Sequence, residues 1–137
     1  MWADDKHCIA CGSENPIGFR LKFELKEGKL FTEHAFDKRF QGYADVVHGG
    51  MIALVLDEVM VTLPWRRDKV PVISGELNMR LHKAAKIGDR LKFEAECGDT
   101  RRRLIQALGR CYNSAGELVA EASARCVKIK NPILPEE

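Results

Sequence analysis

One apolar stretch constrains the fold of this chain more than any other feature. Between Gly50 and Leu63, apolar residues would occupy every side of a helix, and the adjacent acids Asp57 and Glu58 are the main interruption. At ~1.5 Å of rise per residue, such a helix is about 20 Å long. A helix that is apolar nearly all round has to be covered on most of its sides. The rest of the chain must therefore wrap around it.

The flanking sequence can supply that cover as strands. Apolar residues alternate with charged residues on both sides of the helix, which is the period-2 signature of a half-buried strand. The expected strands cover residues 19–25, the segment after the Glu27-Gly28-Lys29 turn, 73–81, 91–97, 103–112 and 117–130, the last two joined by a hairpin turn at "NSAG". The sequence thus predicts an α+β fold in which a curved antiparallel sheet of about six strands wraps around one long central helix.

Length and charge narrow the setting. The chain has 137 residues, which is enough for one domain. We therefore expect a single domain over 1–137, with an N-terminal segment at 1–16 and a frayed tail at 131–137, where "NPILPEE" contains two prolines. With 22 Lys+Arg against 20 Asp+Glu, the net charge is only +2. That balance gives no general attraction to nucleic acid or to anionic lipid.

Two further observations indicate the compartment. The N-terminus "MWADDKHC" is acidic and lacks the apolar core of a signal peptide, and the apolar run 51–63 is too short for a membrane span. The chain has 5 cysteines, an odd number without a dense framework, which fits reduced thiols better than disulfides. We expect a cytoplasmic protein with no membrane or nucleic-acid partner.

These patterns resemble a known family. The order strand, strand, helix, four strands, with "HGG" at 48–50 opening the helix and an aspartate inside it, resembles the hotdog fold. The stretches "CIACGSENPIGFRLKF", "FQGYADVVHGGMIALVLDE" and "AAKIGDRLKFEAE" are similar to the phenylacetate-pathway (PaaI-like) type of acyl-CoA thioesterase. The resemblance covers nearly the whole chain and implies an acyl-CoA substrate and a homodimer or homotetramer. Hotdog proteins also include dehydratases and ligand-sensing regulators, so the fold alone does not settle the function.

The two glycines at the start of the helix are candidates for binding a carbonyl oxygen. Gly49 and Gly50 carry no side chains, so a substrate carbonyl can approach free backbone N–H groups at the positive end of the helix dipole. That is an oxyanion-type site. The alternative is that the glycines only allow a tight turn beneath a packed helix.

Asp57 is the candidate catalytic acid, because the family places its acid seven positions after the second glycine. Seven residues put Asp57 and Gly50 about 10 Å apart along the helix axis, whereas a reacting group must come within about 3.5 Å of the carbonyl carbon. The resemblance implies that two helices pack antiparallel across a dimer, so that Asp57 of one subunit meets Gly50 of the other. Glu58 is rotated by ~100° from Asp57. We expect it to pair with a nearby Arg or Lys beside the substrate rather than to do the chemistry.

Three other residues are candidates for a part in the same site. His48 either fixes the glycine turn and contacts the thioester, or simply caps local backbone. Gln41 resembles an amide residue that related thioesterases place before the glycines to contact the thioester oxygen or the attacking water. Ser74 matches a strand hydroxyl that some relatives use to orient water, although its parity predicts that it lies opposite the apolar face of Leu77, Met79 and Leu81.

"HCIACG" raises the question of a metal. Cys8-x-x-Cys11 followed by glycine resembles half of a zinc knuckle, but structural zinc usually needs four ligands and the chain has no second such pair. His7, His34 or a partner chain would have to complete the site. We therefore expect a packed or exposed thiol pair and no metal cofactor.

Clustered basic residues are candidates for binding the phosphates of coenzyme A. Arg102 and Arg103, within the run 101–103, form one candidate rim, and the stretch 65–67, "WRR", is a second. The sequence does not favour either of them as the phosphate-binding site.

Taken together, these features favour a homo-oligomeric acyl-CoA thioesterase that forms a carboxylic acid and free CoA. Asp57 would act either as nucleophile or as the base that activates water. The alternatives are a non-catalytic acyl-CoA-binding or regulatory hotdog module, and a hotdog hydratase or dehydratase in which His48 does the acid–base work.

Overall fold

A computed structural model of the chain describes residues 3–130 of the 137. It contains six strands, one long helix and one short 3-10 helix. In chain order these are β1 (Glu24–Lys26), β2 (Lys29–His34), η1 (Lys38–Phe40), α1 (Gly49–Asp68), β3 (Val72–Leu81), β4 (Leu91–Arg101), β5 (Leu104–Tyr112) and β6 (Leu118–Lys128). The tail expected to fray, 131–137, lies outside the described residues.

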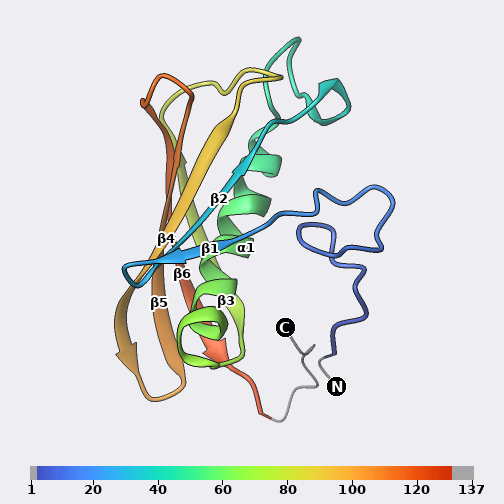
Figure 1. The fold of residues 1–137 in the computed structure, drawn as a ribbon. Coiled ribbons are helices and arrows are strands. Elements are labelled where there is room, and N and C mark those ends of the chain that lie inside the picture. Colours follow the sequence, from blue (N-terminus) through green and yellow to red (C-terminus); the bar gives the residue numbers. More distant parts are fainter. Residues whose placement is uncertain (1–2, 131–137) are drawn as a thin grey trace.

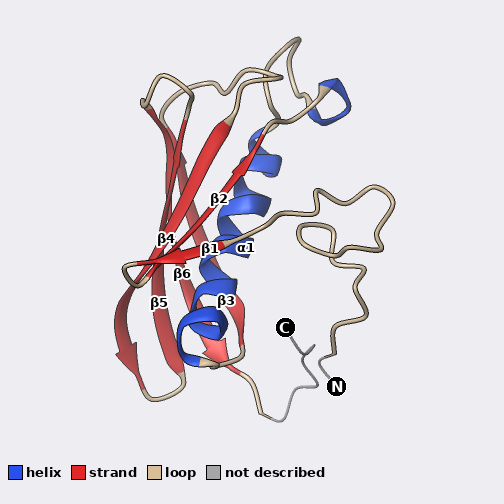
Figure 2. Ribbon diagram, in the orientation of Figure 1, coloured by secondary structure: helices blue, strands red, loops and turns tan. Residues whose placement is uncertain are grey.

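The six strands form one sheet that curves around α1 (Figure 1, Figure 2). Their order across the sheet is β1-β2-β4-β5-β6-β3, and every neighbouring pair is antiparallel. The helix follows β2 in the chain and lies in the concave face. This confirms the predicted fold class, a curved antiparallel sheet around one central helix.

The helix is enclosed from two sides. Its fully buried residues recur every three or four positions and therefore form one stripe that faces the sheet. They are Ile52, Val55, Leu56, Val59, Met60, Leu63 and Pro64. The N-terminal segment covers part of the opposite side (Figure 1), where Ala10 is only 1% exposed. The helix runs from Gly49 to Asp68 and is longer than the predicted 50–63.

The first strand is much shorter than the alternation at 19–25 predicts. Only Glu24–Lys26 pairs as β1. The Phe19 N–H donates to the Ile9 carbonyl and the Leu21 N–H to the Ala10 carbonyl, both at 2.9 Å, so this backbone bonds to the N-terminal segment instead of to a strand. Arg20 has a φ of 51°, which breaks the extended conformation.

Strand β3 contains a bulge that corrects the position predicted for Ser74. The pairing with β6 shifts between Ser74 and Glu76, so the extra residue reverses the side-chain alternation. Ser74 lies opposite Cys126, and Leu77 lies opposite Ala124. Cys126 and Ala124 are both buried on the inner face. Ser74 therefore shares the inner face with Leu77, and the prediction from simple parity is wrong.

The other turn signals agree with the structure. Glu27 and Gly28 have φ of 53° and 76° in the β1–β2 turn. At the β5–β6 turn the Asn113 side chain accepts hydrogen bonds from the Ala115 and Glu117 N–H groups, and Gly116 has a φ of 80°. These positions confirm the two predicted turns. No helix within residues 3–130 is long and apolar enough to cross a membrane.

Candidate active site

The "HGG" turn forms the N-terminal end of α1. His48 is the N-cap, and its Nδ1 accepts a hydrogen bond of 2.8 Å from the Gly50 N–H. The His48 N–H in turn donates to the Phe40 carbonyl at 3.0 Å, which ties the turn to η1. A Cβ on Gly49 would lie 2.9 Å from Leu81 Cδ1. Position 49 therefore has little room for a side chain, because the turn packs closely against the end of β3.

The two glycine N–H groups differ in availability. The Gly50 N–H is engaged by His48, so the structure places His48 in a capping role. The Gly49 N–H, by contrast, meets no acceptor among residues 3–130. Of the two donors expected from the sequence, the Gly49 N–H is the one without an acceptor in the described part of the chain, whereas the Gly50 N–H is free only if the imidazole turns aside.

A cavity of about 650 Å³ opens beside this turn. Its wall includes His48, Gly49 and Ile52 from the start of the helix and Leu81 from β3. The nearby Tyr43 side chain is 90% exposed. The cavity thus places backbone donors and apolar side chains around one space, which is the usual composition of a small-molecule site.

Asp57 presents a carboxylate oxygen without a partner. Its Oδ1 is buried and meets no hydrogen-bond donor within the described residues. Such an atom normally costs about 1–3 kcal/mol, more when it is charged. The negative charge of Asp57 also affects a thiol on the inner face of the sheet. Burial, followed by this charge, raises the pKa of the Cys126 thiol to about 11. Ser74, opposite Cys126 on β6, lies on that same face.

Gln41 lies in the loop before the helix. Its Oε1 accepts a hydrogen bond of 3.1 Å from the Asp45 N–H, and its backbone pairs with Val47 in an isolated bridge. These contacts hold the loop 41–47 closed. In a single chain the side-chain oxygen is therefore occupied by the loop.

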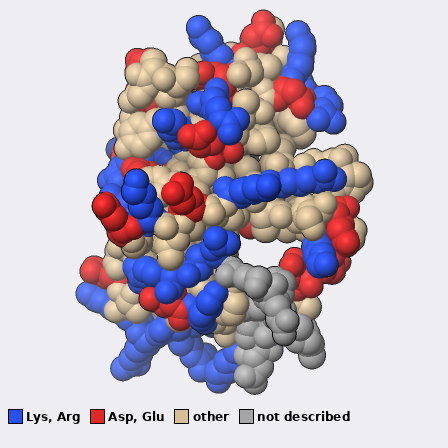
Figure 3. Space-filling view, in the orientation of Figure 1, with Lys and Arg blue, Asp and Glu red and all other residues tan. Residues whose placement is uncertain are grey.

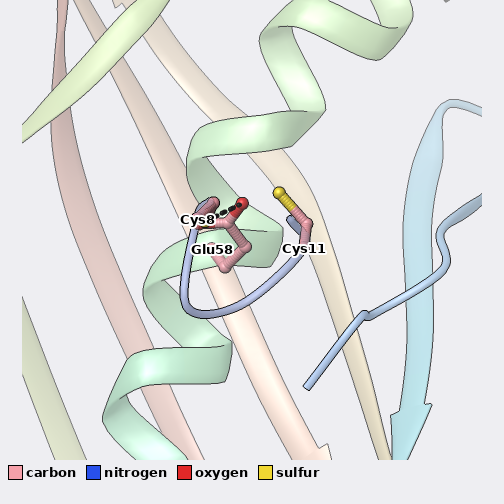
Figure 4. A group of neighbouring side chains, drawn as sticks. All are labelled: Cys8, Cys11 and Glu58. Atoms are coloured by element: carbon pink, nitrogen blue, oxygen red, sulfur yellow. Dashed lines mark hydrogen bonds between the residues drawn. The ribbon is translucent and has the colours of Figure 1, made fainter. Parts of the chain in front are cut away.

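Glu58 has surroundings that sequence reasoning missed. Its carboxylate points toward the N-terminal segment, where Oε1 lies 3.7 Å from Cys8 Sγ (Figure 4). Burial raises the pKa of Glu58 to about 7. No Lys or Arg side chain within the described chain forms an ion pair with it, so the expected basic partner is not found. A contact between positions 50 residues apart leaves no periodic signal in the sequence.

The two N-terminal thiols lie beside this carboxylate and interact with each other. A hydrogen bond with Cys11 is the main cause that lowers the pKa of Cys8 to about 5. The same hydrogen bond raises the pKa of Cys11, because that thiol is the one that keeps its proton. His7 and His34, the residues considered as further metal ligands, do not join this group.

The basic candidates lie at the opposite end of the molecule from the glycine turn. Arg102, with a φ of 50°, and Arg103 form the turn between β4 and β5. In Figure 1 this turn lies at the same end as the last turn of α1, which carries Arg66 and Arg67, and Figure 3 shows Lys and Arg gathered there. Within one chain, this end and the "HGG" turn do not meet.

Comparison with known proteins adds a family. The family model of the thioesterase superfamily matches residues 44–120. No curated protein matches the chain. Among solved structures, a protein described as a thioesterase superfamily protein aligns with a TM-score of 0.81 at 22% identity over 89% of this chain. That protein is longer, and the alignment covers 60% of it.

Two further solved structures share the fold. The E. coli PaaI protein from the phenylacetic acid degradation operon gives a TM-score of 0.76 at 13% identity, covering 84% of this chain and 83% of its own. A Streptococcus mutans protein bound to acetyl-CoA gives 0.74 at 17% identity, covering 82% and 90%. The hotdog fold expected from the sequence is therefore confirmed, together with the likeness to phenylacetate-pathway proteins.

Proposed function

Because the chain belongs to the thioesterase superfamily, we propose that it hydrolyses the thioester of an acyl-CoA to a carboxylic acid and free CoA. The observation that carries this proposal is the buried, unpartnered Oδ1 of Asp57. Acidic groups in such unusual, buried surroundings are found preferentially at functional sites. The acetyl-CoA in the Streptococcus mutans relative supports the substrate class.

The active site is shared between two subunits. One chain separates Gly50 from Asp57 by about 10 Å along the helix, so the carbonyl-binding turn and the acid come from different copies. Strand β3 lies at the edge of the sheet and has 10 residues, and its inner-face residues Leu77 and Leu81 are 38% and 51% exposed. A long, partly apolar edge strand favours pairing with a second copy. Leu81 also contacts Gly49, so this edge adjoins the turn.

In the reaction, the Gly49 N–H donates to the thioester oxygen, with the Gly50 N–H joining once His48 releases it. Asp57 of the partner then attacks the carbonyl carbon to give an acyl–Asp57 anhydride that water hydrolyses, or it removes a proton from a water that attacks the carbonyl directly. The C–S bond breaks, the sulfur leaves as the CoA thiol after taking up a proton, and one water is consumed. We propose that Ser74, on the inner face of the sheet, orients that water.

The arginines at the far end of each chain bind the CoA phosphates. Arg101, Arg102 and Arg103 are exposed and form no ion pair within residues 3–130. When the helices pack antiparallel in a dimer, the C-terminal end of one helix approaches the "HGG" turn of the other. Phosphate binding then also occurs in trans. We propose a single cytoplasmic domain over 1–137, because an odd number of cysteines without a dense framework fits reduced thiols.

A hydratase or dehydratase is one alternative; it would need the Nε2 of His48 for acid–base work, because Nδ1 accepts the Gly50 N–H. A non-catalytic acyl-CoA-binding module is the other alternative. The test is release of free thiol from a panel of acyl-CoAs that differ in acyl length and aromaticity. Turnover of at least one member is expected. Binding of acyl-CoAs without thiol release from any of them would contradict the enzyme and favour the binding module.

A further inference from the structure

The N-terminal segment folds into a tight loop around Cys8 and Cys11. The Gly12 N–H donates to the Cys8 carbonyl at 2.9 Å, and the Glu14 N–H donates to the Lys6 carbonyl at 2.9 Å. A Cβ at position 12 would lie 2.4 Å from the Cys8 nitrogen, so only glycine fits where the loop closes. The loop places both cysteines beside the same point on helix α1 (Figure 4).

The loop is held in place by contacts other than its thiols. Ile9 and Ala10 accept backbone hydrogen bonds from Phe19 and Leu21, each at 2.9 Å. Ala10 is 1% exposed and Leu21 is 6% exposed, so both belong to the core. The position of the two cysteines is therefore set by the fold itself.

Helix α1 adds a third ligand atom to the pair. Glu58 lies between the two cysteines in Figure 4, and one oxygen of its carboxylate and the two sulfur atoms all lie within 4.8 Å of one another. Two thiols and a carboxylate carry negative charge when ionised. Within the described residues no Lys or Arg forms an ion pair with Glu58 to compensate it.

Contrary to the expectation from the sequence, we propose that Cys8, Cys11 and Glu58 form a metal site that binds zinc. Thiolate and carboxylate are both zinc ligands, and two sulfurs select a borderline-soft ion over magnesium or calcium. With Zn–S of ~2.3 Å and Zn–O of ~2.1 Å, ligand atoms that share one tetrahedral ion lie about 3.5–4 Å apart. Separations of up to 4.8 Å therefore need only a small closure of the loop.

The remaining zinc position has room for a small molecule. The three residues border a cavity of about 590 Å³, whose wall also includes Phe23 and Trp65. Water in this cavity completes four-coordination, as in zinc sites with three protein ligands. The ion would join the N-terminal loop to the helix across 50 residues of sequence. Its ligand Glu58 is adjacent to Asp57 but rotated by ~100°, so this site is separate from the proposed thioester chemistry.

Metal content measures the site directly. Protein washed with chelator and kept reduced with a phosphine is titrated with Zn²⁺, and then separately with Co²⁺. We expect about one zinc per chain. Cobalt should give a thiolate-to-metal charge-transfer band and the intense visible bands of a four-coordinate ion. Zinc should also protect two thiols from a thiol reagent, and chelator should expose them again.

Variants locate the ligands. Cys8→Ser, Cys11→Ser and Glu58→Gln should each weaken zinc binding by at least about tenfold, the low end for disturbed metal shells. Cys97→Ser removes a half-buried thiol elsewhere, and Asp57→Asn removes the adjacent carboxylate, so both should still bind one zinc. Circular dichroism of each variant separates loss of the ion from loss of the fold.

Three outcomes would overturn the proposal. The first is folded, reduced wild-type protein that binds less than about a tenth of an equivalent of zinc. The second is a Glu58→Gln variant that binds zinc as tightly as wild type. The third is a Cys8–Cys11 disulfide that forms equally fast with and without zinc, which would make the pair a redox dithiol. None of these measurements uses thioester turnover. A protein that binds no zinc can therefore still be a hydrolase, and a protein without hydrolase activity can still bind zinc.

Discussion

At the scale of single residues, Asp57 and Glu58 are neighbours in the chain but face different surroundings. The buried Oδ1 of Asp57 has no partner among residues 3–130, whereas Glu58 contacts Cys8. Asp57→Asn keeps the volume and removes the charge. We expect it to lower kcat by more than tenfold, which corresponds to over ~1.4 kcal/mol in the barrier, while acyl-CoA binding survives. Thiol release at saturating substrate and binding by calorimetry measure the two effects.

Glu58→Gln is the matched control for this substitution, since it also replaces a carboxylate by an amide, at the next residue in the chain. It should lower kcat by less than Asp57→Asn does. The reverse order would transfer the catalytic role to Glu58. An Asp57→Asn variant that keeps more than about a tenth of wild-type turnover would remove Asp57 from the centre of the mechanism.

His48 supports the helix start through its ring nitrogen. Its Nδ1 accepts the Gly50 N–H at 2.8 Å, and loss of an N-cap acceptor typically costs ~0.5–2 kcal/mol. We expect His48→Ala to lower the free energy of unfolding by about 1 kcal/mol, and His48→Asn to recover most of it, because asparagine also caps helices well. Urea unfolding of the three proteins measures this. Equal stability of the Ala and Asn variants would show that capping is not the role of His48.

Sequence reasoning finds residues whose signal is local. The position of Asp57 on the helix follows from counting along the chain from Gly50. The position of Ser74 does not follow from counting, because the bulge before Glu76 reverses the alternation and no local pattern marks it. The Glu58 contact with Cys8 depends on how the N-terminal loop docks, which is decided by tertiary packing alone.

At the scale of elements, an aromatic cluster at the end of β2 supports the "HGG" turn. The His34 ring lies 4.9 Å from Phe19 and 4.7 Å from Phe36 between ring centroids, and Phe19 also contacts Phe40 at 4.9 Å. Phe40 accepts the His48 N–H. The cluster therefore links β2 and η1 to the start of the helix.

This cluster gives stability a pH dependence. Burial lowers the pKa of His34, nearby Arg90 lowers it further, and Asp37 partly opposes them. As the pH falls below ~6.5, the pKa of histidine in the unfolded chain, His34 takes up a proton in the unfolded chain but stays neutral in the folded protein. The contribution of His34 to the unfolding free energy therefore decreases until the pH is below the folded pKa. We expect His34→Phe to flatten this part of the pH dependence, measured by denaturant unfolding from about pH 7 to 5.

Phe40→Leu is the control for that measurement. It loosens the same cluster without removing a titrating group, so it should lower stability at every pH and keep the wild-type dependence. A His34→Phe protein whose unfolding free energy changes with pH as steeply as that of wild type would assign the dependence to other groups.

Elements with strong periodicity follow from the sequence, and elements shaped by long-range hydrogen bonds do not. The alternation in 91–97 and the turns at 27–29 and 113–116 predict β4 and the two hairpins correctly. The equally regular alternation at 19–25 gives only the three-residue β1, because its backbone bonds to Ile9 and Ala10. Period-2 patterning reports which side chains are buried, and not which backbone groups are paired.

At the scale of the whole molecule, the shared site predicts complementation between inactive variants. Asp57→Asn removes the acid, and Gly50→Pro removes the second of the two N–H groups that hold the thioester oxygen during the reaction, in the first helical turn, where proline is tolerated. When the two are unfolded together and refolded in equal amounts, about half of the dimers are mixed, and each mixed dimer has one intact site. We expect about a quarter of wild-type thiol release if subunits pair at random.

Each variant refolded alone is the control and should stay inactive. A site contained within one chain would carry a lesion in every copy, so mixing would restore nothing. Absence of recovery, with mixed dimers confirmed by native mass spectrometry, would rule out the shared site while leaving the fold unaffected.

The strand order also has a consequence for how the chain folds. Strands β4, β5 and β6 follow one another through short turns, so their hairpin pairings can form quickly. The pairs β2–β4 and β3–β6 instead join segments far apart in sequence, and such closures are slow. Because α1 lies between these two closures, its apolar surface is enclosed late. We therefore expect the species most prone to aggregate during refolding to be a finished three-stranded meander with the helix still uncovered.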